Sequence, residues 1–205
     1  MSTDEELALL EKIIKTRRSI RRYQPTPIPH ELLERLLESA MWAPSAHNRQ
    51  PWRFAIVNKL TTQITLAKAM GARLRQDLEA DGVDEAIIVA DVQRSYERIT
   101  GAAALICLCV SMVDMDTYSD EIRNAHEQTM AIQSVAMAGQ NLLLAAHAAG
   151  LGACWMCAPL FCADVVRSVL ALPDDWQPQA LITLGYPAQE RTHTRESLQT
   201  RLVWR

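Results

Sequence analysis

A concentrated group of basic residues lies in the segment TRRSIRRY, between positions 16 and 23. Its four arginines are Arg17, Arg18, Arg21 and Arg22. A guanidinium presents a planar fork of donors that suits a phosphate, and the hydroxyl of Ser19 adds another donor among them. The alternative is a solvated helix end, where basic residues complement the negative end of the helix dipole. Taken alone, the cluster favours the solvated end, because charge runs are usually exposed.

A second polar stretch lies in WAPSAHNRQPWRF, residues 42–54, between an expected helix and an expected strand. Its polar residues are Ser45, His47, Asn48, Arg49 and Gln50. Pro44 and Pro51 flank these residues and stiffen the loop, which indicates that the loop holds something rather than only connecting two elements. An ordinary surface turn is the alternative.

A third segment, AAGLGACWMCAPLF at 148–161, combines glycines with a CxxC pair. Gly150 and Gly152 allow the backbone to approach a flat group closely. The spacing of Cys154 and Cys157 is typical of a metal site or a redox-active dithiol, but no second CxxC or nearby histidine pair completes a zinc site. The stretch also reads as extended, without the helix that a thioredoxin-like motif needs. Packing as small apolar side chains is therefore the default interpretation of these thiols.

The rest of the sequence offers no self-sufficient catalytic group. It contains no GxSxG, no Walker loop and no GxGxxG after a strand. His126 and His147 fall in a long expected helix and read as ordinary surface or core histidines. No Ser/His/Asp set or carboxylate pair can be singled out. If the chain is an enzyme, a cofactor carries the difficult chemistry.

The composition is that of one ordinary globular domain. The chain has 205 residues, 49% of them apolar and 22% charged, with a net charge of −3. This balance argues against a general nucleic-acid or membrane-surface binder, so any recognition of an anion must be local. The acidic start MSTDEELALL predicts no export signal, and an odd number of cysteines, five, predicts reduced thiols and a cytoplasmic location. Residues 142–163 approach the length of a membrane span, but two glycines and Pro159 interrupt them.

Hydrophobic periodicity predicts helices that outweigh a few buried strands. Helices are expected from a cap at Ser2 or Thr3 to the arginine cluster, from near Pro29 to Pro44, and twice over 61–99 with a break near Asp81-Gly82. Further helices are expected over 121–149, which is rich in small residues at its end and has Gly150 as a left-handed cap, and over 163–171. Strands are expected over 52–57, 102–110, 152–157 and 179–187. One sheet wrapped by helices, of the α+β or α/β class, is the predicted fold.

Several apolar faces follow from the same periodicity. The first helix carries a stripe of Leu7, Leu10, Ile13 and Ile14. The helices of 61–99 are expected to bury Leu74, Leu78, Ile87, Ile88 and Val92. The C-terminal tail ends in Val203 and Trp204, which have no obvious place in the chain's own core. A partner subunit would explain this tail.

Six segments, in order along nearly the whole chain, resemble the nitroreductase family of FMN-dependent oxidoreductases. They are RRSIRRY, APSAHNRQPWRF, GLGACW, LITLGYP, HTR and VWR. A closer resemblance is to the C-terminal flavin-binding reductase domain of the bifunctional deazaflavin-cofactor biosynthesis protein. It rests on AMGARLRQDLEADG, QRSYERITGAAALICLCV and LFCADVVRSVLALPDDWQP. The N-terminal ligase domain of that bifunctional protein has no counterpart in this sequence, so a different substrate is an open alternative.

The resemblance implies one FMN-binding domain, residues 1–205, with an α+β fold. Its architecture would be a three-layer α/β/α sandwich, in which helices wrap a central, mostly antiparallel sheet, assembled as an intertwined homodimer. The cofactor-binding residues that it implies are Arg17, Arg18, Ser19, Arg21, Pro44, Ser45, Asn48, Gln50, Cys157, Ala158, His193 and Arg195. No metal and no catalytic side chain are implied, because N5 of the flavin would carry the chemistry.

The implied roles fall into two halves of a site. Arg17, Arg18 and Ser19 would hold the FMN phosphate and ribityl chain, with Arg195 as a second phosphate ligand and His193 as a weaker one. Arg21 would lie at the pyrimidine edge, where a cation stabilises the negative charge of reduced flavin. A backbone N–H at Ala158, beside Cys157, would reach N5. The loop with Pro44, Ser45, Asn48 and Gln50 would come from the partner subunit.

The main hypothesis from the resemblance is an NAD(P)H oxidoreductase with ping-pong kinetics. NADH or NADPH would donate hydride to FMN, and a small nitroaromatic, quinone or similar conjugated acceptor would then take the same position over the flavin. The alternatives are a reductase of a deazaflavin-cofactor precursor, a flavin-binding module without turnover, and a basic-loop nucleic-acid binder.

Overall fold

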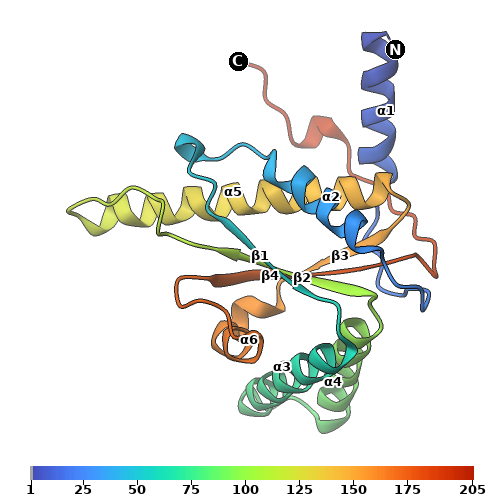
Figure 1. Cartoon of the computed structure of the whole chain (residues 1–205), viewed down its shortest axis with the longest axis vertical. Helices are drawn as coiled ribbons and strands as arrows, with labels where there is room; N and C mark the ends of the chain where they lie inside the picture. The colour runs from blue at the N-terminus through green and yellow to red at the C-terminus, as the bar shows by residue number, and fades with distance from the viewer. Residues whose placement is uncertain (1) are drawn as a thin grey trace.

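Four strands form one antiparallel sheet in a computed structural model of the protein, which describes residues 2–205 (Figure 1). The strands are β1 (Trp52–Val57), β2 (Ala104–Val110), β3 (Gly152–Met156) and β4 (Gln177–Gly185). Their order is β1-β2-β4-β3, and each neighbouring pair is antiparallel. The four predicted strands are confirmed, and the α+β class with them.

Six α-helices accompany the sheet. They are α1 (Thr3–Thr16), α2 (His30–Met41), α3 (Leu60–Ala80), α4 (Glu85–Thr100), α5 (Glu121–Ala148) and α6 (Ala163–Leu170). Short 3-10 turns cover Ala46–Asn48, Ala158–Phe161 and Leu198–Thr200. Figure 1 shows α2 and α5 on one side of the sheet and α3, α4 and α6 on the other. The predicted three layers are thus confirmed.

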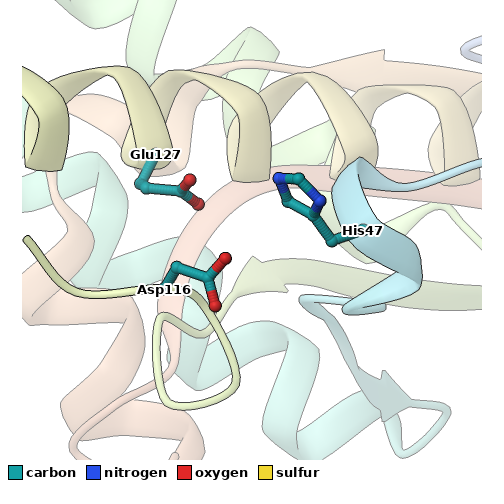
Figure 2. Close-up of side chains that lie close together, drawn as sticks. All are labelled: His47, Asp116 and Glu127. Atoms are coloured by element: carbon teal, nitrogen blue, oxygen red, sulfur yellow. The ribbon is translucent and has the colours of Figure 1, made fainter.

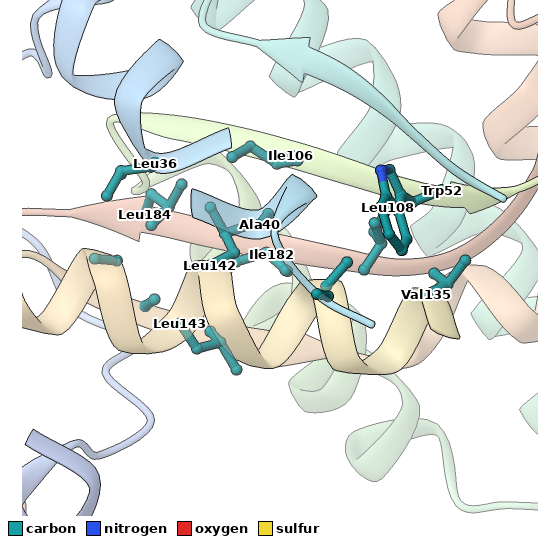
Figure 3. Close-up of a cluster of buried hydrophobic side chains, with 14 of the residues drawn as sticks. Leu36, Ala40, Trp52, Ile106, Leu108, Val135, Leu142, Leu143, Ile182 and Leu184 are labelled. Atoms are coloured by element: carbon teal, nitrogen blue, oxygen red, sulfur yellow. The ribbon is translucent and has the colours of Figure 1, made fainter. Parts of the chain in front are cut away.

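Strand β2 explains the layering, because all seven of its residues are buried. Alternate side chains of a strand point to opposite faces, so a continuous apolar run needs cover on both. Ile106 and Leu108 join the core beneath α2 and α5 (Figure 3), while Leu105 and Cys107 join the core beneath α3 and α6.

The long helix α5 approaches the sheet closely at Gly139. A Cβ at this position would overlap the Trp155 ring of β3 and come within 2.9 Å of the Leu108 Cδ2 of β2. The small residues at the end of α5, read from the sequence as a small-residue-rich segment, therefore allow helix and sheet to pack tightly.

Helix ends follow the expected local chemistry. The side chain of Ser2 accepts from the backbone N–H of Glu5, whose own side chain accepts from the N–H of Ser2, so the predicted cap of α1 is confirmed. Gly150 follows α5 with a φ of 78°, the left-handed backbone predicted for it.

The prediction of a buried face on the α3–α4 pair is partly wrong. Ile88 is buried as expected, but Ile87 is 54% exposed. Leu74 and Leu78 are only half-buried, whereas Leu66 and Met70, nearer the start of α3, are buried. The pair projects past the sheet (Figure 1), so its far end has less to pack against than periodicity alone suggests.

Two apolar segments extend away from the core beyond the layer of α2 and α5 (Figure 1). Helix α1 has no buried residue, and Leu7, Leu10 and Ile14 on its stripe are about half exposed. In the tail, Trp204 is 87% exposed. Among the helices of the described residues, none is both long and apolar enough to cross a membrane.

Candidate functional site

The arginine-rich segment is held against the edge of the sheet, along β3. The backbone N–H of Ile20 donates to the carbonyl of Ala153 at 3.0 Å, and Ser19 forms a bridge with Ala153. The contact is close, because a Cβ at Gly152 would lie 2.8 Å from the Cβ of Ile20. Arg17 is half-buried. The segment is therefore anchored in the fold, unlike a solvated helix end.

Arg18 ties the C-terminal segment to the end of α1. Its Nη1 donates to the carbonyls of Lys15 at 2.6 Å and Arg17 at 2.7 Å, and its Nη2 donates to the carbonyl of His193 at 3.0 Å. Its Nε is buried without a hydrogen-bond partner in the described structure. Arg18 thus brings residue 193, and the neighbouring Arg195, back to the arginine segment.

Positive charge accumulates around Arg17. Burial, then Arg195 and Arg18, lower the pKa of the Arg17 guanidinium from its ordinary value. Burial also lowers the pKa of His147, with further contributions from Arg17 and Arg18. Nε2 of His147 lies 2.8 Å from the Thr16 hydroxyl. A bound dianion would relieve this repulsion, so the donor set fits a phosphate.

A second cationic group lies around Arg21. Burial, then Arg21 and Arg94, lower the pKa of Arg98 on α4. Burial raises the pKa of the Cys154 thiol, an effect that Arg21 and Arg98 oppose. Arg98 is not among the site residues predicted from the sequence. Its signal was the spacing of Arg94 and Arg98, four residues apart and hence on one face of a helix.

A cavity of about 490 Å³ lies beside this group. One acidic residue, Glu97, and five arginines line it: Arg21, Arg22, Arg94, Arg98 and Arg191. Arg22, to which the family resemblance assigns no role, is exposed, although it contributes to this cavity. The arginine lining suits an anionic molecule.

The predicted loop 44–50 forms a compact turn that lies away from the arginine segment. The backbone N–H of Gln50 donates to the Ser45 hydroxyl at 3.1 Å, and the Gln50 amide Nε2 lies 3.5 Å from the carbonyl of Asn48. His47, Asn48 and Gln50 all have a left-handed backbone, with φ between 50° and 54°. Such strain at non-glycine residues clusters at functional sites.

The chain keeps the two halves of the predicted site apart. The backbone N–H of Ala46 donates to the Ser134 hydroxyl of α5 at 3.3 Å, whereas the arginine half contacts the same helix at His147. Thirteen residues of helix separate these points, or about 20 Å at 1.5 Å per residue. Pro44, Ser45, Asn48 and Gln50 therefore do not meet Arg17 within one chain.

Cys157 and Ala158 lie beyond the far end of β3. Cys157 is exposed, and its sulfur accepts from Nε1 of Trp155 at 3.2 Å. Ala158 begins a 3-10 turn, so its backbone N–H has no partner within that turn. Cys154 is buried and both thiols of the CxxC pair are free.

Comparison with known proteins gives one consistent result. A profile of the nitroreductase family matches residues 14–186. The NADH dehydrogenase of Thermus thermophilus is 34% identical, over 92% of each chain. A Desulfovibrio desulfuricans protein solved in complex with FMN is 27% identical, with a TM-score of 0.73 over 96% of each chain. The NADPH:FMN oxidoreductase of Vibrio harveyi, at 20% identity, shares the fold with a TM-score of 0.71 over 95% of this chain and 76% of its own.

Proposed function

Because the chain belongs to the nitroreductase family, we propose that it is an FMN-dependent oxidoreductase that uses NADH or NADPH to reduce a small conjugated acceptor. Nitroaromatics and quinones are the acceptor classes. The observation that carries the proposal is the positive charge at Arg17, where Arg18 and Arg195 converge on a guanidinium that is itself half-buried. A phosphate is the ligand that this arrangement fits best.

The residues of this half would hold FMN as follows. Arg17 and Arg195 bind the phosphate, and Ser19 binds the ribityl chain, while Arg18 and His193 hold the two segments together. When bound, FMN supplies the exchange of hydride between a nicotinamide and the acceptor. Arg21 provides a positive charge that stabilises electron density at the pyrimidine edge.

Arg98 and Ala158 complete the proposed cofactor contacts of this half. Arg98 reaches the group of Arg21 from α4 and adds to its positive charge. Ala158 offers its free backbone N–H at the far end of β3, next to Cys157. The protein thus contributes orientation and electrostatics rather than a titrating catalytic group.

A homodimer would supply the missing half of the site. The partner's loop, corresponding to Pro44, Ser45, Asn48 and Gln50, would then contact the cofactor held by the arginines. The 20 Å separation within one chain, by helix rise, and the exposed apolar face of α1 support this assembly. The whole chain, 1–205, would act as one FMN-binding domain. Five cysteines, an odd number, support a cytoplasmic location.

Native mass spectrometry tests the cofactor and the assembly together. The spectrum of the purified protein is expected to show the mass of two chains with two FMN molecules, because each site needs residues of both subunits. A variant lacking residues 198–205 is expected to lose both dimer and flavin, while Arg205→Ala, at the exposed last residue, keeps them. A monomer that retains FMN would contradict the shared site, and a protein that takes up no added FMN would contradict the proposed function.

The arginine-lined cavity favours a second candidate for the acceptor. Its five guanidinium groups suit a phosphorylated or carboxylated molecule better than a neutral nitroaromatic. Reduction of a deazaflavin-cofactor precursor is a reaction of this kind. The test compares the turnover of Arg94→Ala with that of the wild type. Slower turnover with an anionic acceptor and unchanged turnover with a neutral quinone would support this candidate. The absence of any turnover would favour a flavin-binding module.

A further inference from the structure

One oxygen of a buried carboxylate lacks a partner near the start of α5 in the described structure. Glu127 is only 2% exposed. Its Oε1 accepts from the Tyr118 hydroxyl at 3.3 Å, but its Oε2 is buried without a hydrogen bond in the described structure. Leaving a buried carboxylate oxygen unpaired is costly, so this oxygen calls for a proton donor or a cation.

Two other potential metal ligands face Glu127 across a small gap (Figure 2). One ligand atom from each of His47, Asp116 and Glu127 lies within 4.8 Å of the other two. The residues come from three separate segments: the 3-10 turn Ala46–Asn48, the connection after β2, and α5. His47 and Asp116 thus lie beside the carboxylate group whose Oε2 lacks a hydrogen-bond partner in the described structure.

The surroundings hold two of these groups in position. His47 adopts a φ of 51°, and the amide of neighbouring Ala46 donates to Ser134 of α5. Arg49 forms an ion pair with Oδ1 of Asp116. Such an outer partner fixes the orientation of a ligating carboxylate, as metal sites require.

We propose that His47, Asp116 and Glu127 bind a divalent metal ion of the zinc class. One imidazole nitrogen and two carboxylate oxygens are ligands that Zn²⁺ takes, at about 2.0–2.2 Å, with the fourth position open to water. Ligand atoms of a tetrahedral ion are about 3.4 Å apart, so the exposed His47 closes the present gap by a small movement. The ion supplies the cation that Oε2 of Glu127 lacks.

The ion would tie the turn at Ala46–Asn48 to α5. The adjoining residues Ser45, Asn48 and Gln50 belong to the loop proposed to reach the partner's cofactor, so metal binding would fix that loop. Only this consequence rests on the proposed function. The metal site itself rests on the three ligands.

Calorimetric titration of the full chain with ZnCl₂, after dialysis against a chelator, tests the site. The expected result is one Zn²⁺ per chain. His47→Ala and Asp116→Asn are each expected to weaken binding at least 10- to 100-fold, roughly the loss that follows removal of even an outer partner. His126→Ala is the matched control, since His126 is exposed on the same helix next to Glu127 and outside the cluster.

Thermal unfolding of Glu127→Gln adds a second readout. Zn²⁺ is expected to raise the melting temperature of the wild type but not of this variant, because a ligand stabilises only the state that binds it. Should the variant fail to fold, His47→Ala, at an exposed side chain, decides the question. Absent zinc binding, or binding that survives His47→Ala and Asp116→Asn, would overturn the site. Flavin content measured in the same samples distinguishes this failure from failure of the proposed function.

Discussion

Substituting Arg17 by alanine is expected to weaken FMN binding roughly 10- to 100-fold, since a hydrogen bond to a charged group contributes about 1.5–3 kcal/mol. Arg17 is half-buried among like charges, so its guanidinium is committed to an anion rather than to an internal carboxylate. Fluorescence titration of the apoprotein with FMN measures the effect. Arg22→Ala, at an exposed arginine of the same segment, is the control and is expected to change the affinity little. Equal affinities of the two variants would contradict the phosphate assignment.

The titration of His147 shows whether Arg17→Ala acts locally. Burial and the charges of Arg17 and Arg18 lower the pKa of His147 in the folded chain. Because the unfolded chain then binds the proton first, this histidine removes stability as the pH falls below about 6.5. Removing the Arg17 charge is expected to raise the pKa of His147 and weaken that pH dependence. Proton NMR of the His147 ring follows it directly, and an unchanged titration would place Arg17 away from His147.

Substituting Gly139 by alanine is expected to destabilise the fold by about 3 kcal/mol or more, at the upper end of overpacking effects. The added methyl would overlap the Trp155 ring and lie 2.9 Å from Leu108 Cδ2, both fixed in the sheet. Helix propensity alone predicts the opposite sign, a gain of about 1 kcal/mol for Gly→Ala. Urea denaturation measures the balance.

Gly71→Ala is the matched control for this prediction. It also replaces a helical glycine, but its methyl would lie 3.2 Å from one Val92 side-chain carbon, which can move. Its free energy of unfolding is expected to change little. Combining Gly139→Ala with Trp155→Leu is expected to recover part of the lost stability, because the smaller side chain leaves room for the methyl. Equal losses in Gly71→Ala and Gly139→Ala would contradict the close packing of α5 on the sheet.

Periodicity and turn chemistry predicted the elements well because the signals are local. The buried run of β2, the cap at Ser2 and the glycine after α5 each depend on a few neighbouring residues. The exposure of Ile87 could not be predicted, since it depends on how far the α3–α4 pair projects beyond the sheet. That distance is a property of the tertiary arrangement.

The site was predicted only where its residues share one segment. The arginines of 17–21 could be proposed from sequence, and their distance from the loop 44–50 becomes apparent only along the folded α5. Arg98, on α4, reaches the arginine group through the fold. The same holds for His47, Asp116 and Glu127, which are far apart in sequence and meet only in three dimensions. Side chains from distant segments leave no spacing pattern that local reasoning can detect.

Anaerobic stopped-flow mixing of the FMN-loaded protein with NADH and, separately, NADPH tests the oxidoreductase function most directly. We predict that at least one nicotinamide bleaches the visible flavin absorption at least as fast as the enzyme turns over. A quinone or nitroaromatic is then expected to restore the absorption. Arg205→Ala, at the exposed last residue, should bleach at the rate of the wild type. Flavin that stays oxidised in saturating NADH and NADPH, in protein fully loaded with FMN, would contradict the function proposed here.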